Sequence, residues 1–184
     1  MDLRKFWDGK LLLAALASAA VVDTAGLFIW RYTADRDGPI NIWYDKFGVI
    51  AYVLDVSSVV VGFVLAQLIT YAIGGSYNLL FFLIVVVAVQ MTHDILFSLF
   101  LVPLVPEGEN DIMDLMKSYT TMKGSGWVLV VDALYMILTT LGALVLYKLP
   151  SYVTWFTLLF VPYVTGYILT THRLLSSRIS TPLQ

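Results

Sequence analysis

The sequence predicts an all-α integral membrane protein, built as a bundle of five transmembrane helices with one short interfacial helix. Of its 184 residues, 59% are hydrophobic and only 13% are charged, a composition too apolar for a soluble domain of this size. Several apolar runs also reach the roughly 18 to 20 residues that a helix needs to cross a bilayer. We therefore expect one polytopic domain over residues 1–184, with the lipid bilayer as its main partner.

The net charge and the absence of cysteine exclude several classes of function. The formal net charge of −2, without any cluster of basic residues interleaved with aromatics, excludes a strongly basic nucleic-acid binder. The absence of cysteine from the sequence excludes disulfides, thiol catalysis, iron–sulfur clusters and cysteine zinc sites. No cofactor is evident from the sequence, and a bound cation is the ligand that remains to be considered.

Five apolar runs, separated by polar segments or by glycine and proline, predict the membrane helices. They span about residues 11–32, 47–73, 77–102, 127–147 and 152–171. The first run follows Arg4, Lys5 and Lys10 in the manner of a signal peptide. Because its apolar character continues to Trp30, we interpret it as an uncleaved membrane helix.

Small residues four positions apart on the first two predicted helices favour close approach of a neighbouring helix. Ala14 and Ser18, or Ala15 and Ala19, form such a face on the first helix. The second helix has an equivalent row made of Ser58, Gly62 and Ala66. These faces predict tight helix packing, and a homo-oligomer is one arrangement that they permit.

Glycine and proline mark the remaining turns. The sequence Gly74-Gly75-Ser76 leaves room only for a tight hairpin, so the second and third helices are expected to be antiparallel neighbours. Pro103 is expected to end the third helix, and Pro162 to kink the fifth.

Residues 110–122 predict the interfacial helix. Asn110 is a favourable N-cap and Asp111 is suited to a first helical turn. The apolar residues recur at helical spacing, namely Ile112, Leu115, Met116 and Tyr119. The acidic run at 107–111 lacks the spacing of an EF-hand, so a capped helix start is favoured over a calcium loop.

The candidate functional residues are polar side chains inside the apolar runs, because such groups are costly in lipid and normally face a protein interior or a hydrated cavity. Gln90, His93, Asp94 and Phe97 follow the i, i+3, i+4, i+7 spacing, which places them on one face of the third helix. His93 beside Asp94 has the ligand chemistry of a proton carrier or a metal site. No spaced histidine pair identifies a particular metal.

Four of the predicted helices each carry one aspartate at a similar depth. These are Asp23, Asp55, Asp94 and Asp132. Each lies roughly 9 to 14 Å from a helix end that faces the same side, counted at 1.5 Å per residue. Four ionised aspartates cannot coexist in a low dielectric, so the predicted layer is hydrated, partly protonated, occupied by a cation, or paired with basic groups reaching in from the helix ends.

Two interpretations of this layer stay open. In the first it is a cation or proton site made of Asp23, Asp55, Gln90, His93, Asp94 and Asp132, supported by Ser58, Tyr135, Arg31 and Arg173. In the second it is a structural network in which Arg31 pairs with Asp23, Lys46 with Asp55, and Arg173 joins from the last helix.

Three stretches resemble uncharacterised multi-pass membrane proteins encoded by large DNA viruses and algae. They are residues 23–27 (DTAGL), 93–97 (HDILF) and 106–110 (PEGEN), with Asp132 following. The resemblance extends over most of the chain and implies no known chemistry. It implies a viral or host internal membrane, and a role in the lipid layer of a virion.

Three classes of function follow from these patterns. The leading one is a small cation or proton transporter or channel. The second is a structural or assembly protein of a virion or organelle membrane. The third is an intramembrane enzyme acting on lipid, with His93 and Asp94 as acid–base pair or metal ligands, which requires a lateral opening to lipid. The enzyme ranks last because the sequence does not supply a nucleophile, a base and an orienting group together.

Overall fold

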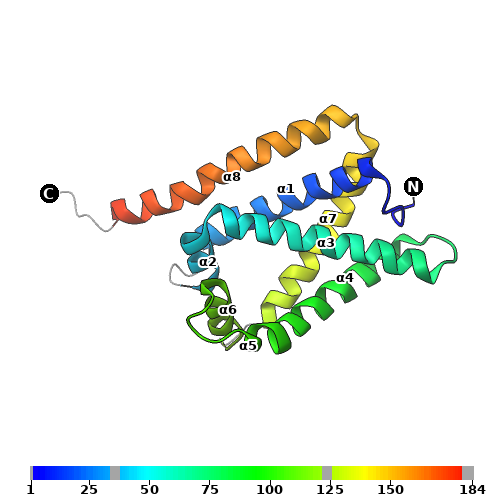
Figure 1. Ribbon diagram of the computed structural model, residues 1–184. Helices are drawn as coiled ribbons and strands as arrows, with labels where there is room; N and C mark the ends of the chain where they lie inside the picture. Colours follow the sequence, from blue (N-terminus) through cyan, green and yellow to red (C-terminus); the bar gives the residue numbers. More distant parts are fainter. Residues whose placement is uncertain (1, 34–37, 122–125, 180–184) are drawn as a thin grey trace.

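The computed structural model describes residues 2–33, 38–121 and 126–179, and over these residues the secondary structure is helical, without a strand (Figure 1). In the described chain, five helical segments are long and apolar enough to cross a membrane. They are α1 (Gly9–Thr33), α3 (Val49–Ile73), Leu79–Leu104, α7 (Gly126–Lys148) and the Ser151–Thr170 part of α8 (Ser151–Ile179). The predicted fold class is confirmed, and the segments are compatible with an integral membrane protein.

The third membrane segment is interrupted in a way that the sequence pattern does not show. It consists of α4 (Leu79–Leu96), a π-helical turn η1 (Phe97–Leu101) and α5 (Val102–Leu104). The expectation that Pro103 ends the helix is wrong by one residue, because Pro103 sits in the first turn of α5, where its missing N–H is tolerated. Pro162 likewise lies inside the continuous helix α8.

A further helix, α2 (Pro39–Phe47), lies in the polar segment between the first two predicted membrane helices. Gly38 is extended and precedes Pro39, whose fixed φ suits the first helical position. The helix ends at Gly48, which has a positive φ of 53° and donates its N–H to the carbonyl oxygen of Tyr44 at 2.9 Å. Its apolar side packs on α1, α3 and α8 through a small core of Leu27, Tyr44, Ala51 and Leu169.

The predicted interfacial helix is present as α6 (Asp111–Thr121). Asn110 Oδ1 accepts hydrogen bonds from the backbone N–H groups of Ile112 and Met113 at 2.9 and 3.1 Å, as expected for an N-cap. Lys46 of α2 forms an ion pair of 3.4 Å with Asp111. The two amphipathic helices α2 and α6 thus lie together at one end of the bundle (Figure 1).

Helix α1 is the centre of the bundle and packs against α3, α7 and α8. Its predicted small-residue face is buried within the chain, where a methyl group at Gly142 of α7 would overlap Ser18 Oγ. A methyl group at Gly26 would overlap the hydroxyl of Tyr135 in the same way. Gly62 of α3 is also tightly enclosed, since an added Cβ would lie 3.0 Å from Met136 Cε. The small residues therefore serve packing inside one chain, and the homo-oligomer stays a prediction.

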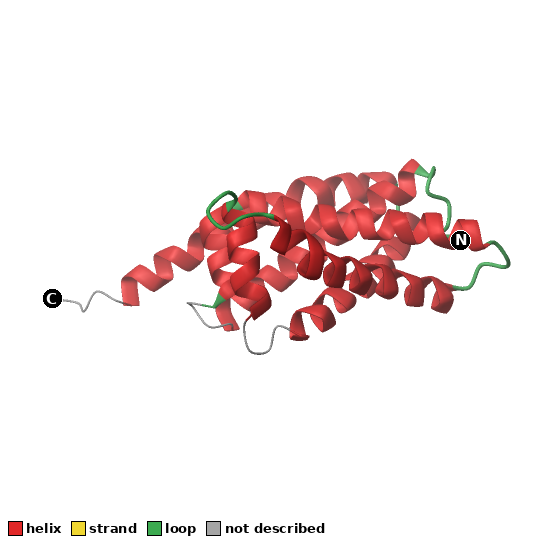
Figure 2. Cartoon of the chain, turned by 60° about the horizontal axis from the view of Figure 1, so that its bottom comes forward, coloured by secondary structure: helices red, strands yellow, loops and turns green. Residues whose placement is uncertain are grey.

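The predicted antiparallel hairpin between the second and third membrane helices is confirmed. Gly74 and Gly75 turn the chain with φ angles of 74° and 78°, and Asn78 Oδ1 caps α4 by accepting from Leu80 and Phe81 N–H. Helices α3 and α4 lie together at this hairpin and diverge toward the end that holds α2 and α6 (Figure 1). Figure 2 shows the N-terminal segment at the hairpin end of the bundle, away from α2 and α6.

Candidate functional site

The structure brings the four membrane aspartates into one electrostatic cluster, here called the carboxylate layer: Asp23 of α1, Asp55 of α3, Asp94 of α4 and Asp132 of α7. The charges of Asp55 and Asp132 act on Asp23, and those of Asp94 and Asp55 act on Asp132. The aspartates that were predicted at a common depth therefore influence one another electrostatically across helices. Because the interactions are between like charges, the layer attracts positive charge.

Asp23 is the most deeply buried member of the layer. Only 3% of its surface is exposed, and its Oδ2 atom is buried without a hydrogen-bond partner among the described residues. The next residue, Thr24, uses its hydroxyl elsewhere, 2.6 Å from Thr165 Oγ1 of α8. A buried carboxylate that lacks a partner is energetically costly, so this group requires a proton or another cation nearby.

Asp55 is held by α2. Its Oδ2 accepts hydrogen bonds from the Trp43 indole at 2.9 Å and from the Tyr44 hydroxyl at 2.8 Å. Burial, reinforced by the charge of Asp55, raises the pKa of Tyr44 well above its ordinary value, so Tyr44 stays a hydrogen-bond donor. Ser58 Oγ donates to the backbone oxygen of Asp55 at 2.8 Å, and its supporting role toward the carboxylate stays a prediction.

Trp43 and Tyr44 were missed as site residues by the sequence analysis. Their position next to each other before an apolar run resembles an interfacial aromatic pair. The signal that identifies them is the helical spacing from Ile40 to Phe47 after Gly38-Pro39, which predicts an amphipathic helix with both rings near its inner side. Tyr119 of α6 also borders the layer, where burial and then the charges of Asp132 and Asp55 raise its pKa to about 12.

The predicted face of the third membrane helix is present as a hydrogen-bonded group. Asp94 Oδ1 accepts from Gln90 Nε2 at 2.8 Å and lies 3.0 Å from His93 Nδ1. Asp94 Oδ2 is buried without a partner in the described part of the chain. The His93 side chain is 52% exposed, against 18% for that of Asp94, and its ring stacks on Phe97 at a centroid distance of 5.9 Å. His93 therefore forms the outer edge of the layer.

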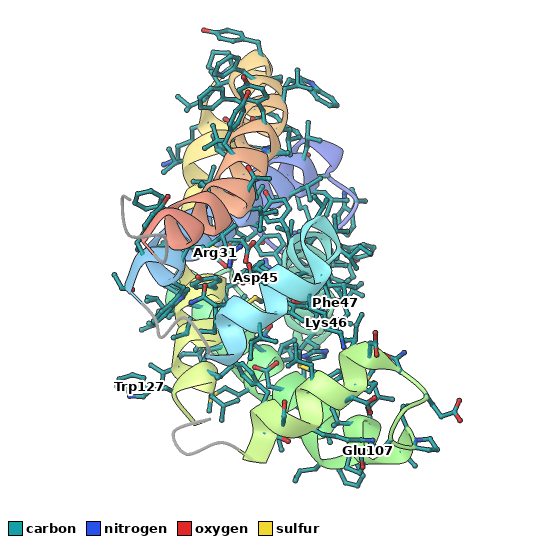
Figure 3. The ribbon with its side chains drawn as sticks, turned by 90° about the vertical axis from the view of Figure 1, so that its left-hand side faces the viewer. Arg31, Asp45, Lys46, Phe47, Glu107 and Trp127 are labelled. Carbon is teal, nitrogen blue, oxygen red and sulfur yellow. The ribbon has the colours of Figure 1, made fainter. Side chains whose placement is uncertain are left out.

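The basic side chains that the structural-network interpretation assigned to the layer have other partners. The fully buried side chain of Arg31 pairs with Asp45 of α2 at 2.7 Å, and its Nη2 donates to the backbone oxygen of Leu169 at 3.0 Å. Figure 3 shows Arg31 and Asp45 beside each other. Lys46 pairs with Asp111. The predicted pairings of Arg31 with Asp23 and of Lys46 with Asp55 are therefore wrong, and the side chain of Arg173 lies outside the described residues.

Tyr135 has a supporting place between α7 and α1. Its hydroxyl fits against the bare backbone of Gly26, three residues after Asp23, and it hydrogen-bonds with Trp30. The charges of Asp23, Asp132 and Asp55 all act on it. Tyr135 thus fixes the distance between the two helices that carry Asp23 and Asp132.

Within the described part of the chain, no group of three or more histidine or carboxylate side chains is arranged to hold one metal ion. Comparison of the sequence and structure with family models, curated proteins and solved structures finds no match. The resemblance to membrane proteins of large DNA viruses and algae stays a prediction.

Proposed function

We propose that the protein is an integral membrane protein that takes up a cation, H⁺ included, in the carboxylate layer and moves it within or across the membrane. The observation that carries this proposal is the buried carboxylate of Asp23, whose Oδ2 has no partner among the described residues. The charged groups acting on it, Asp55 and Asp132, add negative potential. Arg31, the basic residue nearest to Asp23 along the same helix, is paired with Asp45.

The gradient of exposure across the layer supports a direction of entry. His93 is half exposed, Asp94 behind it is mostly enclosed, and Asp23 is buried. The His93 ring, with its Nδ1 on the Asp94 carboxylate, lies between that carboxylate and the surroundings of the protein. A cation thus enters at His93 and Asp94, passes to Asp132, and is held at Asp23.

Flux measurements on the full chain in proteoliposomes test this function. We expect an imposed proton or monovalent-cation gradient to decay faster with wild-type protein than in empty vesicles, and the Asp23→Asn and Asp94→Asn variants to lose most of that flux. Glu107→Gln removes one charge from an exposed loop residue and is the matched control. Equal flux in wild type and both layer variants contradicts the proposal.

A structural or assembly role is the second candidate. It is favoured by polar contacts that join α1 to α8, since the Thr24 hydroxyl meets Thr165 at 2.6 Å beside the layer and Arg31 reaches the Leu169 carbonyl at 3.0 Å two turns further along α1. Under this role Asp23→Asn changes stability equally in every ionic condition. A lipid-acting enzyme ranks third, and turnover of phospholipid that is abolished in His93→Gln is the result that supports it.

A further inference from the structure

At the end of the bundle away from the carboxylate layer, the N-terminal segment and the α3–α4 hairpin line an open surface hollow of about 240 Å³. It is lined by Asp2, Arg4, Lys5, Trp7, Tyr71 and Gly74. The volume is several times the roughly 30 Å³ that one water occupies in the liquid, so the hollow has room for a group of phosphate size.

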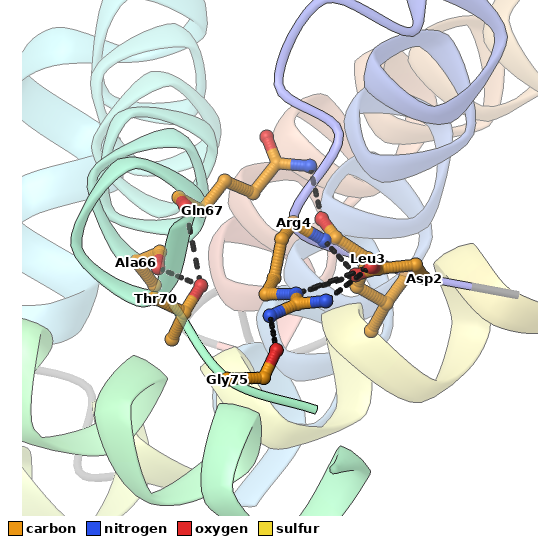
Figure 4. Close-up of polar contacts among 7 residues, drawn as sticks. All are labelled: Asp2, Leu3, Arg4, Ala66, Gln67, Thr70 and Gly75. Atoms are coloured by element: carbon orange, nitrogen blue, oxygen red, sulfur yellow. Dashed lines mark hydrogen bonds and ion pairs between the residues drawn. The ribbon is translucent and has the colours of Figure 1, made fainter. Parts of the chain in front are cut away.

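The N-terminal segment is fixed in place by the bundle. Leu3 is completely buried, and its carbonyl oxygen accepts a hydrogen bond of 2.6 Å from Gln67 Nε2 of α3 (Figure 4). Arg4 Nη1 donates to the carbonyl oxygen of Gly75 in the hairpin at 2.7 Å. The walls of the hollow therefore come from two parts of the chain that are held against each other.

Arg4 is oriented in advance by Asp2. Its Nε and Nη2 atoms donate to the Asp2 carboxylate at 2.6 to 3.1 Å, and this contact lowers the pKa of Asp2. A guanidinium has five N–H donors, so after the described contacts to Asp2 and Gly75 one N–H on each terminal nitrogen remains. Because Asp2 neutralises Arg4, the exposed Lys5 gives the hollow a net positive charge.

Aromatic rings form the rim. Trp7 meets Phe6 and Tyr71 edge to face, with centroids 4.8 and 5.3 Å apart. Tryptophan and tyrosine favour the headgroup level of a bilayer, so these rings place the hollow at that depth. The lining combines the charged groups of Asp2, Arg4 and Lys5 with the rings of Trp7 and Tyr71. The rings suit the glycerol and first acyl carbons of a lipid, which a free phosphate ion does not have.

We infer that this hollow binds an anionic phospholipid, with the headgroup phosphate on Lys5 and the remaining Arg4 donors and the glycerol region against Trp7 and Tyr71. The site is independent of the carboxylate layer. It fixes the hairpin end of the bundle to one leaflet and makes the stability of the protein depend on lipid charge.

Thermal unfolding of the full chain in neutral detergent tests the inference, with phosphatidylglycerol, phosphatidylcholine or glycerol phosphate added. The variant is Lys5→Gln, which leaves the Asp2–Arg4 pair intact. The matched control is Lys10→Gln, because Lys10 sits over the Tyr147 ring at 4.9 Å and does not line the hollow.

We expect phosphatidylglycerol to stabilise wild type and Lys10→Gln at equal concentrations, and Lys5→Gln to need about tenfold more of it, as for the loss of one charge-assisted hydrogen bond. If phosphatidylglycerol stabilises all three proteins equally, its effect comes from the overall charge of the lipid and not from this hollow, and the inference is overturned. Stabilisation by glycerol phosphate as strong as that by the lipid overturns the assignment to a lipid. No difference between phosphatidylglycerol and phosphatidylcholine overturns it as well.

Discussion

Arg31 and Asp45 form an ion pair of 2.7 Å in which the arginine side chain is completely buried. Arg31 also contacts Asn41 and the carbonyl oxygen of Leu169, so it joins α1 to α2 and α8. By turning toward α2 it leaves Asp23, two turns away on the same helix, without a positive partner among the described residues. The arrangement separates a structural ion pair from the carboxylate layer, in which no described lysine or arginine forms an ion pair.

Removing the guanidinium should destabilise the protein without affecting Asp23. We expect Arg31→Gln to lower the free energy of unfolding by about 2 to 4 kcal/mol, because buried acceptors lose their donor. A double-mutant cycle should give a clear coupling of Arg31→Gln with Asp45→Asn and none with Asp23→Asn. Coupling to Asp23 of the same size would show that Arg31 neutralises the layer after all.

The contact of Gly26 with Tyr135 predicts a second effect on stability. Gly26→Ala forces the half-buried Tyr135 side chain to move and should cost about 1 to 3 kcal/mol, measured by thermal or denaturant unfolding in detergent. Gly166→Ala in α8 is the control, since an added Cβ meets nothing within 4 Å there. It should be neutral or stabilising by up to about 1 kcal/mol through helix propensity. Equal costs for both variants would contradict the tight α1–α7 contact.

The pKa of Tyr119, which lies in α6 outside the membrane segments, depends on the charge of the layer. Its pKa of about 12, above the ordinary value of about 10, means that the folded state holds the phenolic proton more strongly than the unfolded state does. Its contribution to stability is therefore complete below pH 10 and is lost as pH rises toward 12. In an ultraviolet titration, Tyr119→Phe should remove the absorbance change of one phenol that ionises near pH 12.

The same titration tests the proximity of Asp132. Of the two carboxylates that raise the pKa of Tyr119, Asp132 has the larger effect. Asp132→Asn should therefore lower the pKa of Tyr119, although burial keeps it above the ordinary value. An unchanged phenolate titration in Asp132→Asn would place α6 away from the layer.

The membrane helices could be predicted from the sequence because length and apolar composition alone specify them. The hairpin at Gly74 and Gly75 and the cap at Asn110 could be predicted for a similar reason, since each depends on neighbouring residues. Helix α2 was missed although Gly38-Pro39 and the spacing of Ile40, Trp43 and Phe47 indicate it, because the segment is short and mixes charged with aromatic residues.

The candidate site, too, could be predicted only in part from the sequence. Asp23, Asp55, Asp94 and Asp132 could be placed at one depth by counting residues, and the Gln90–Asp94 contact follows from helical spacing. The partners of Arg31 and Asp55 could not be predicted, because α2 folds back over the bundle and the residues that it presents depend on tertiary packing. The exposure of His93 depends on the divergence of α3 and α4, which hydropathy does not report.

The most direct test of the carboxylate layer is the thermal stability of wild type and Asp23→Asn in detergent, across pH and a panel of mono- and divalent cations, with Glu107→Gln as control. A ligand that binds only the folded state adds RT ln(1 + [L]/Kd), about 2.7 kcal/mol at a hundredfold excess over Kd. We predict that one cation, H⁺ included, stabilises wild type and Glu107→Gln and has no effect on Asp23→Asn. If the three proteins respond alike to every cation and pH, the layer is not a cation site.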